Sequence, residues 1–532
     1  MIYAAVVAVF VLLVTVVTLA TVAPRLRVPY PILLVLGGLA LGFVPGLPSI
    51  ALDPALILFL FLPPLIYASA WFTPWRDFRA NLRSILLLAI GLVLTCTTLV
   101  AVVAHSVLGL AWPVTFVLGA LVSPTDAVAA SAIMQRLGVS RRVVTIVEGE
   151  SMVNDATGLV LYRFAVVAVV TGSFSIWQAS WQFLVVSAGG ILIGLLVAWP
   201  MVWLHRRLDD APREITITLL TPFAAYLLAD ALGASGVLAV LATGLYLSRH
   251  SSTIFSPNTR LQADSFWNVL VFLFNGLVFI LLGLQLHGLL GGATPQSLAA
   301  LIGAATLISV VVIVVRLAWV AVATSVLRLL AHVQLITYRW AGWRNALVVG
   351  WAGMRGAVSL AAALALPLAL ADGTPFPARS QLIGVTFGVI LFTLVGQGLS
   401  LTPLIRWLGV GGEAESEIEQ EVALARRAVT LSGLARLEEL AVTEDMPQVV
   451  VADQRAHLEE QLDRRGAPAS GSDGAEGDQQ LDIVVAARRL RRDVISAERA
   501  QLIALRDQGQ IDDEVLRRLE RELDLEEQQL SG

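Results

Sequence analysis

Two short segments place carboxylates inside stretches that otherwise have the composition of membrane-spanning helices. The first is Ser123-Pro-Thr-Asp126, and the second is Glu148-Gly-Glu-Ser-Met-Val-Asn-Asp155. A charge at the centre of a bilayer costs about 2.5–3.5 kcal/mol on insertion scales, so residues of this kind usually have a function. Thr125, Ser151 and Asn154 add neutral oxygen donors that suit a hard monovalent cation. These residue types predict a site that exchanges protons for cations.

Helical spacing brings the polar residues of the second segment onto one face. Ser151 and Asp155 are four residues apart, and so are Glu150 and Asn154. In the first segment, Pro124 lacks a backbone donor and disrupts the helix, which a membrane tolerates only where the freed carbonyls find partners. Such carbonyls beside an acid are available to a desolvated cation. The alternative, that the two aspartates only hydrogen-bond to neighbouring helices, is disfavoured beside a proline break and an Asn-Asp pair.

A third segment, Gly350-Trp-Ala-Gly-Met-Arg-Gly-Ala-Val-Ser359, interrupts a later apolar run with glycines around Arg355. An unpaired arginine there would be costly, so it needs either an acid or helix-terminal carbonyls as partners. Arg316, midway along the preceding apolar run, is expected to face protein rather than lipid. Two interrupted helices at matching positions in two halves indicate an inverted-repeat transporter with its site near the membrane midplane.

The composition sets the class of molecule that holds these segments. The 532 residues are 57% apolar and only 14% charged, with a mean hydropathy of +0.78. Soluble domains are nearer 25% charged, so the chain is expected to be an all-α, polytopic membrane protein. Apolar runs long enough to cross a bilayer predict thirteen spans, at about 2–23, 28–44, 52–72, 84–110, 112–134, 143–170, 178–204, 214–232, 234–248, 264–287, 297–327, 345–371 and 381–408.

Charge gives the predicted orientation and a second domain. With the N-terminus outside, the cytoplasmic connections carry seventeen arginines and the outer ones only Arg379. Residues 1–410, the predicted transmembrane domain, hold 21 arginines and 12 acids, whereas residues 411–532 hold 15 arginines and 28 acids. The second region is predicted to be an acidic, helical cytoplasmic tail with a flexible linker near 466–480. It is either a solvated appendage or a regulatory or dimer-stabilising element.

The motifs resemble those of monovalent cation:proton antiporters, specifically the NhaP-like bacterial relatives of animal Na+/H+ exchangers. The resemblance rests on Pro-Thr-Asp126, Gly-Glu-Ser-x-x-Asn-Asp155 and Gly-Met-Arg355-Gly, supported by Phe61-Leu-Pro-Pro-Leu, and it covers about residues 5–410. It implies thirteen helices, a crossing of broken helices five and twelve, a homodimer, and alternating access by an elevator-like movement. It also implies cation ligands from Asp126, Asp155, Ser151 and the Thr125 region, supported by Glu150 and Asn154, with Arg355 stabilising the core.

One feature departs from that family pattern. Many members carry a glutamate shortly after the third-span Pro-Pro, and this acid pairs with the arginine of the twelfth span. Here the stretch from Pro63 to Trp71 contains no acid. The partner of Arg355 is therefore open at this point, with Glu148 and Glu150 as candidate replacements.

We therefore expect an antiporter of the bacterial cytoplasmic membrane that exchanges Na+, with Li+ as a further cation, for H+ and contributes to pH homeostasis. Asp155 would bind either a proton or a cation, and only the loaded site would reorient. Asn154 has no titratable proton, which favours electroneutral one-for-one exchange, as does the resemblance. No enzyme activity, cofactor or nucleic-acid partner is expected.

The alternatives are K+/H+ or unselective exchange, a channel or tail-signalling sensor, and an intramembrane hydrolase. For the hydrolase, the chain has no His-Glu-x-x-His or Gly-x-Ser-x-Gly motif with a histidine partner.

Overall fold

The computed structural model describes residues 2–26, 29–44, 54–172, 175–290, 295–332, 342–370, 373–443, 448–463 and 480–531. Within these ranges the regular structure is helical, apart from one isolated bridge between Ala369 and Pro375. The predicted all-α class is confirmed. Residues 466–479 of the predicted linker lie outside the described ranges.

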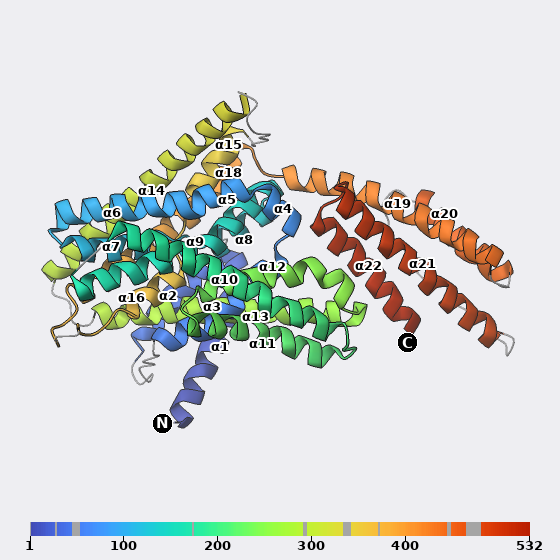
Figure 1. Ribbon diagram of the computed structural model, residues 1–532, viewed down its shortest axis with the longest axis horizontal. Coiled ribbons are helices and arrows are strands. Elements are labelled where there is room, and N and C mark those ends of the chain that lie inside the picture. The colour runs from blue at the N-terminus through green and yellow to red at the C-terminus, as the bar shows by residue number, and fades with distance from the viewer. Residues whose placement is uncertain are drawn as a thin grey trace. The chain divides into compact units, whose positions relative to one another are not determined.

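The chain divides into two compact units. The first comprises Met1–Leu208, Arg213–Ser252 and Ser265–Gly412, and the second comprises Asp209–Pro212, Thr253–Asp264 and Glu413–Gly532. In Figure 1 the colours from blue to yellow follow the helices up to α18, and orange and red mark the tail helices α19 to α22. The second unit therefore joins the tail to two short segments from between the predicted spans.

The helices before the tail follow the predicted spans in order. They are α1 (Ile2–Leu26), α2 (Tyr30–Gly42), α3 (Pro54–Phe72), α4 (Trp75–Ala80), α5 (Leu82–Leu86), the π-helical η1 (Leu87–Leu92), α6 (Val93–Leu108), α7 (Trp112–Val122), α8 (Val128–Arg136), α9 (Arg141–Thr171), α10 (Ile176–His205), α11 (Ala211–Ala231), α12 (Gly236–Ile254), α13 (Pro257–Leu290), α14 (Pro295–His332), α15 (Trp343–Trp351), α16 (Ala357–Leu364), α17 (Arg379–Phe392), the π-helical η2 (Thr393–Gln397) and α18 (Gly398–Leu408).

Eight of the described helical stretches are long and apolar enough to cross a membrane, and three shorter helices are also apolar. Each predicted span overlaps a helix, and the fifth and twelfth are each divided into two, as α7–α8 and α15–α16. The predicted eighth and ninth spans are separate helices, α11 and α12, joined by a turn in which Gly233 has a φ of +71°. The exact number of crossings stays a prediction.

Within the described residues the tail contains four helices. The part before the predicted linker contains α19 (Glu413–Thr443) and α20 (Gln448–Asp463). The piece near 481–528 contains α21 (Gln480–Gln508) and α22 (Asp513–Ser531), separated by a turn in which Gly509 has a φ of +83°. A glycine adopts this left-handed conformation without the steric cost of a side chain.

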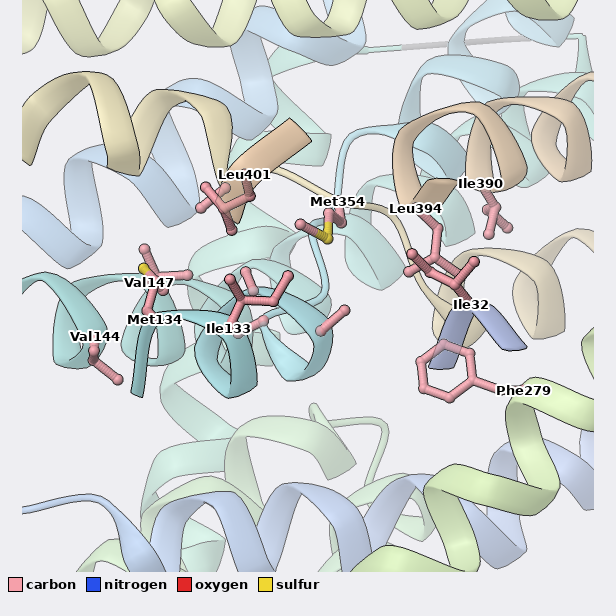
Figure 2. Close-up of a cluster of buried hydrophobic side chains, with 14 of the residues drawn as sticks. Ile32, Ile133, Met134, Val144, Val147, Phe279, Met354, Ile390, Leu394 and Leu401 are labelled. Carbon is pink, nitrogen blue, oxygen red and sulfur yellow. The ribbon is translucent and has the colours of Figure 1, made fainter. Parts of the chain in front are cut away.

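The two interruptions, between α7 and α8 and between α15 and α16, are called the first and the second break. An apolar cluster surrounds them and holds them in place. Figure 2 shows Met354, from the second break, between Leu401 of α18 on one side and Leu394 of η2 on the other. Ile32 of α2 and Phe279 of α13 belong to the same buried cluster. Close packing of this kind leaves little empty space and resists displacement, so the two helix breaks are held in defined positions. The other labelled members are Ile133, Met134, Val144, Val147 and Ile390.

Candidate functional site

The break in the fifth predicted span arises from Pro124. The helix α7 ends at Val122, and α8 begins at Val128. Gly158 of α9 lies so close that a Cβ there would overlap the Pro124 ring. The proline therefore ends the helix as predicted, and a glycine on α9 allows the interrupted backbone to approach closely.

Asp126 ties this break to the break in the twelfth span. Its backbone N–H donates to the Met354 carbonyl at 2.7 Å, and its Oδ1 accepts from the Val128 N–H at 2.8 Å. A Cβ at Gly356, the residue before α16, would overlap the Asp126 carboxylate. The carboxylate thus lies at the beginning of both α8 and α16, where helix dipoles favour negative charge. The expected meeting of the two broken helices is present in this geometry.

Arg355 plays the opposite electrostatic role at the ends of helices. Its Nε donates to the carbonyl of Val122, the last residue of α7, at 3.0 Å, and its Nη1 donates to the Gly353 carbonyl. Its backbone N–H donates to Thr393 Oγ1 of η2 at 3.2 Å. Of the two partner types expected from the sequence, helix-terminal carbonyls are the ones found, and the suggestion that Glu148 or Glu150 replaces the missing third-span acid is wrong. A cation at the end of a helix is favourable because the carbonyls there lack partners.

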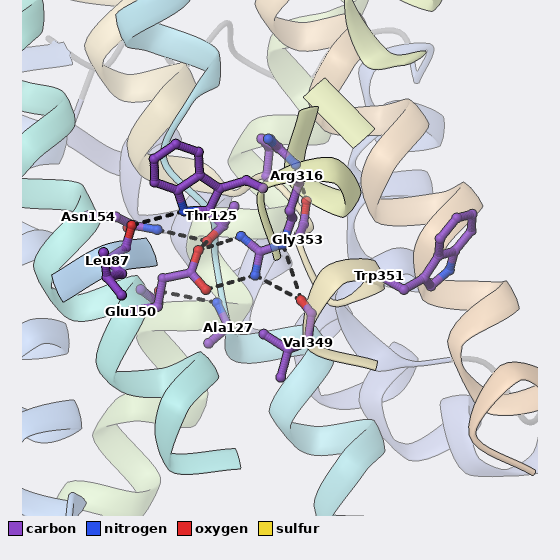
Figure 3. Close-up of polar contacts among 12 residues, drawn as sticks. Leu87, Thr125, Ala127, Glu150, Asn154, Arg316, Val349, Trp351 and Gly353 are labelled. Atoms are coloured by element: carbon purple, nitrogen blue, oxygen red, sulfur yellow. Dashed lines mark hydrogen bonds and ion pairs between the residues drawn. The ribbon is translucent and has the colours of Figure 1, made fainter. Parts of the chain in front are cut away.

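Glu150 is instead paired with Arg316 of α14. Both side chains are 1% exposed, and Arg316 Nη1 and Nη2 donate to Glu150 Oε1 and Oε2, the second bond being 2.8 Å long. Arg316 also donates from Nε and Nη2 to the Val349 carbonyl of α15, at 3.2 and 3.0 Å (Figure 3). The expectation that Arg316 faces protein is confirmed. Its two-pronged pairing with Glu150 is a feature that sequence reasoning missed.

The pair depends on a glycine that the sequence pattern left unexplained. A Cβ at Gly353 would overlap Cδ and Nε of Arg316. Gly353 therefore leaves space for the guanidinium to reach both Glu150 and Val349. The available signal was the presence of two buried opposite charges, Glu150 and Arg316, in otherwise apolar helices, because such charges need partners.

A short chain of hydrogen bonds connects the Asn-Asp pair to that ion pair. Asn154 Nδ2 donates to Thr125 Oγ1 at 2.7 Å, and Thr125 Oγ1 donates to Glu150 Oε1 at 3.1 Å (Figure 3). Asn154 is fully buried, and its Oδ1 has no hydrogen-bond partner among the described residues. The chain runs from α9 to the break and back to α9, so it holds Thr125 beside the Asn-Asp pair.

Asp155 differs from Asp126 and Glu150 in having no polar partner among the described residues. It is partly exposed, and it makes no hydrogen bond or ion pair with the residues that the structure describes. It experiences like-charge repulsion from Asp126. Ser151, one turn earlier on α9, accepts from the Ala127 N–H of the break at 3.2 Å. The structure thus gathers Asp126, Asp155, Ser151, Thr125, Glu150 and Asn154 around the first break, with Arg355 in the second.

Comparisons with known proteins agree with this architecture. The family model described as "Sodium/hydrogen exchanger, transmembrane" matches residues 11–407. A Na+/H+ exchanger of Mycobacterium tuberculosis is 38% identical over 98% of this chain and 96% of its own length. A sodium, potassium, lithium and rubidium/H+ antiporter of Bacillus pumilus is 33% identical over 80% of this chain and 64% of its own length.

A solved structure supports the fold. The sodium proton antiporter MjNhaP1 of Methanocaldococcus jannaschii has a TM-score of 0.58, covers 76% of this chain and 98% of its own, and is 21% identical. The family is one of transporters, so the prediction of a transporter rather than an enzyme is confirmed. With the matching family model and the full-length mycobacterial relative, the chain belongs to the sodium/hydrogen exchanger family.

Proposed function

We propose that this protein exchanges one Na+ for one H+ at Asp155 across the bacterial cytoplasmic membrane. The observation that carries the proposal is that Glu150 and Asp126 have polar partners in the structure, whereas Asp155 has none among the described residues. Glu150 is neutralised by Arg316, and Asp126 accepts from the backbone at the start of α8. Asp155 has no such partner among the described residues, so its carboxylate is the one available to a proton or a cation.

The surrounding oxygens supply a coordination shell for the cation. Ser151 lies on the same helix face as Asp155, and Ser151 and Asn154 bond to the break that carries Thr125 and Asp126. Oxygen donors suit a hard cation, and carbonyls freed by the helix break can replace part of its water shell. Proton and Na+ compete because each neutralises the same carboxylate. Only the neutralised site is then able to move through the apolar core at a tolerable cost.

The same charge balance supports electroneutral exchange. With Glu150 cancelled by Arg316 and Asp126 facing two helix beginnings, Asp155 carries the one uncompensated charge of the site. One Na+ or one H+ is enough to cancel it. Asn154 contributes an amide where a second acid would demand a second cation. Asn154 and Glu150 therefore hold the break in place, while Arg355 holds the helix ends.

The orientation and assembly complete the proposal. The arginine distribution supports an outside N-terminus and a cytoplasmic tail, and the family resemblance supports a homodimer in the lipid bilayer. The second candidate is exchange of K+ or of several monovalent cations. It is favoured by the name of the Bacillus pumilus relative, which includes potassium, lithium and rubidium.

The test is proton movement in proteoliposomes, followed with a pH-sensitive dye after separate additions of Na+, Li+ and K+. Na+ and Li+ should each dissipate the gradient, and the half-saturating Na+ concentration should rise as the pH falls, because protons compete for Asp155. Flux that is insensitive to an imposed membrane potential supports the one-for-one ratio. A steady conductance without coupled proton movement would contradict antiport, and an equal response to K+ would select the second candidate.

A further inference from the structure

The tail helices form one compact unit with the beginning of α13. Apolar side chains of α19, α21 and α22 make a continuous buried cluster that includes Val422, Ile495, Leu502, Leu516 and Leu519. Residues Thr253–Asp264, which include the first two turns of α13, belong to the same compact unit. Because α13 continues without a break into the first unit, any restraint on its beginning acts on a helix that serves both units.

Arginine–carboxylate pairs fasten the tail to this beginning of α13. Arg260 donates from Nε to Asp524 Oδ2 at 3.0 Å and from Nη2 to Asp524 Oδ1 at 2.6 Å, in a two-pronged contact. Asp524 is buried and also accepts from Arg499 of α21 at 2.9 Å. Arg521 reaches Asp264 at 2.9 Å. Two-pronged, charge-assisted bonds of this kind are among the strongest polar contacts, so α22 is held to α13 and to α21 at once.

Glu498 of α21 is buried and faces residues of α19 and α22. Gly433 of α19 packs directly over it, because a Cβ there would lie 2.8 Å from Glu498 Oε1. Arg491 Nη1 lies 3.4 Å from Glu498 Oε2, but the shorter bonds of Arg491, at 2.6 and 2.9 Å, go to Glu526 of α22. The charged groups that act on Glu498 are therefore Arg491 from its own helix and Glu526 from α22, while α19 presents a glycine.

This environment makes the tail unit sensitive to protons. Burial raises the pKa of Glu498 from 4.5 to about 7, the nearby Arg491 opposes the rise, and Glu526 adds to it. An acid whose pKa is higher in the folded state stabilises that state in its protonated form. The contribution is complete below pH 4.5 and is lost as the pH rises through about 7. The packed tail should therefore loosen as the cytoplasm becomes alkaline.

We propose that α19, α21 and α22 form a proton-responsive clamp on the beginning of α13, with Glu498 as the titrating group and the Arg260–Asp524 contact as the attachment. At low pH the clamp holds the start of α13. At high pH the ionised Glu498 weakens the packing of α21 against α19, and the restraint on α13 is relaxed. The restraint on the proposed exchanger is thereby released when protons are scarce, a consequence that rests on the proposed antiport.

The first arm of the test measures the clamp without transport. Hydrogen exchange of the full-length protein is followed in α19, α21 and α22 at pH 6 and pH 8, for the wild type and for Glu498→Gln. Comparison at equal pH removes the intrinsic pH dependence of exchange. Opening of the wild-type tail should increase about tenfold relative to Glu498→Gln between these pH values. The matched control is Glu522→Gln, which removes the same charge from an exposed position on α22 and should behave as the wild type.

The second arm measures regulation. Glu498→Gln should match the wild type in Na+-driven proton flux at pH 6 and fall below it at pH 8, because its clamp stays closed. Asp524→Asn, which weakens the attachment, should reduce the difference between the two pH values. Equal hydrogen exchange in the wild type and Glu498→Gln at both pH values, or the same effect in Glu522→Gln, overturns the sensor.

The two arms separate this inference from the proposed function. Altered protection with a flux that matches or exceeds the wild type at pH 8 overturns the coupling to transport. Absence of Na+-driven flux in the wild type contradicts the proposed antiport, whereas the hydrogen-exchange arm still decides whether Glu498 controls the tail.

Discussion

The membrane site and the tail both contain arginines and carboxylates, but they pair these side chains in different ways. In the site, Glu150 and Arg316 form a fully buried one-to-one ion pair, and Arg355 is satisfied by carbonyls. In the tail, Asp524 is shared between Arg260 and Arg499. The fully buried Glu150–Arg316 pair leaves no charge of its own unbalanced, whereas the partly exposed Arg260 and Arg499 can share one buried carboxylate because solvent reaches both guanidinium groups. The difference indicates that the Glu150–Arg316 pair holds fixed charges, whereas Asp155 in the site and Glu498 in the tail are the proposed groups whose charge changes.

The largest effect on exchange should come from Asp155, the acid of the site that has no polar partner among the described residues. Asp155→Asn removes the proposed binding group for both ions, so exchange should be abolished while the protein remains folded. Its thermal stability should be unchanged or higher, since the change deletes a partly buried charge that has no partner among the described residues. Dye-based flux in proteoliposomes and thermal unfolding in detergent measure the two outcomes. Glu148→Gln is the matched control, because Glu148 lies on the same helix and bonds to Gln135 away from the break. Wild-type flux in Asp155→Asn would refute the assignment of the site.

Breaking the buried pair should mainly affect folding. Arg316→Ala leaves Glu150 buried without its partner, which should lower the free energy of unfolding by about 3–5 kcal/mol. The double variant Glu150→Gln with Arg316→Ala should recover part of that loss, because the unpaired charge is removed as well. Thermal unfolding of the wild type, both single variants and the double variant gives the coupling energy. Additive losses would show that the two residues do not act as a pair.

The close approach of the two breaks can be tested with a single methyl group. Gly356→Ala would force the added Cβ against the Asp126 carboxylate, and overpacking of this kind costs about 1–3 kcal/mol. We expect lowered stability together with reduced flux, since the displaced carboxylate belongs to the proposed site. Gly396→Ala is the control, because a Cβ there meets nothing within 4 Å. Equal behaviour of the two variants would argue against a tight crossing.

Removal of the tail tests the other side of the comparison. A chain that ends after Gly412 keeps every proposed ligand and Arg355, so it should insert and still exchange. The dependence of flux on cytoplasmic pH should flatten, because Glu498 and its clamp are gone. Flux at several pH values and the oligomeric state in detergent should be measured together. Complete loss of flux from a truncated protein that remains dimeric and monodisperse would make the tail part of the transport mechanism.

The smallest effect should come from an exposed pair in the tail. Arg426 of α19 and Glu522 of α22 lie 2.9 Å apart, with side chains that are 41% and 47% exposed. Such surface pairs contribute about 0–1 kcal/mol, so Arg426→Ala should leave thermal unfolding and flux nearly unchanged. A large loss of tail protection in hydrogen exchange would show that this pair, rather than the buried Arg260–Asp524 contact, holds the helices together.

Some features of the site followed from the sequence because the chemistry is local. Pro124 had to interrupt its helix, and the spacing of Ser151 and Asp155 had to place them on one face. The family of the chain was also evident from motifs of a few residues each. The role of Gly353 was not, because a glycine is explained only by the side chain that occupies its missing Cβ, here Arg316.

By itself, the sequence determined that the chain is a polytopic helical membrane protein with acids in its interior, since the apolar runs long enough to cross a bilayer and the acids within them are properties of residue type and order. Tertiary structure decided which charge compensates which. Glu150 and Arg316 are separated by 166 positions in the chain. Arg355 donates to backbone carbonyls, although the sequence also allowed an acid as its partner. Several pairings satisfy the same list of charges, and only packing selects among them, because the partner of a buried charge is the group that the fold brings within hydrogen-bond distance.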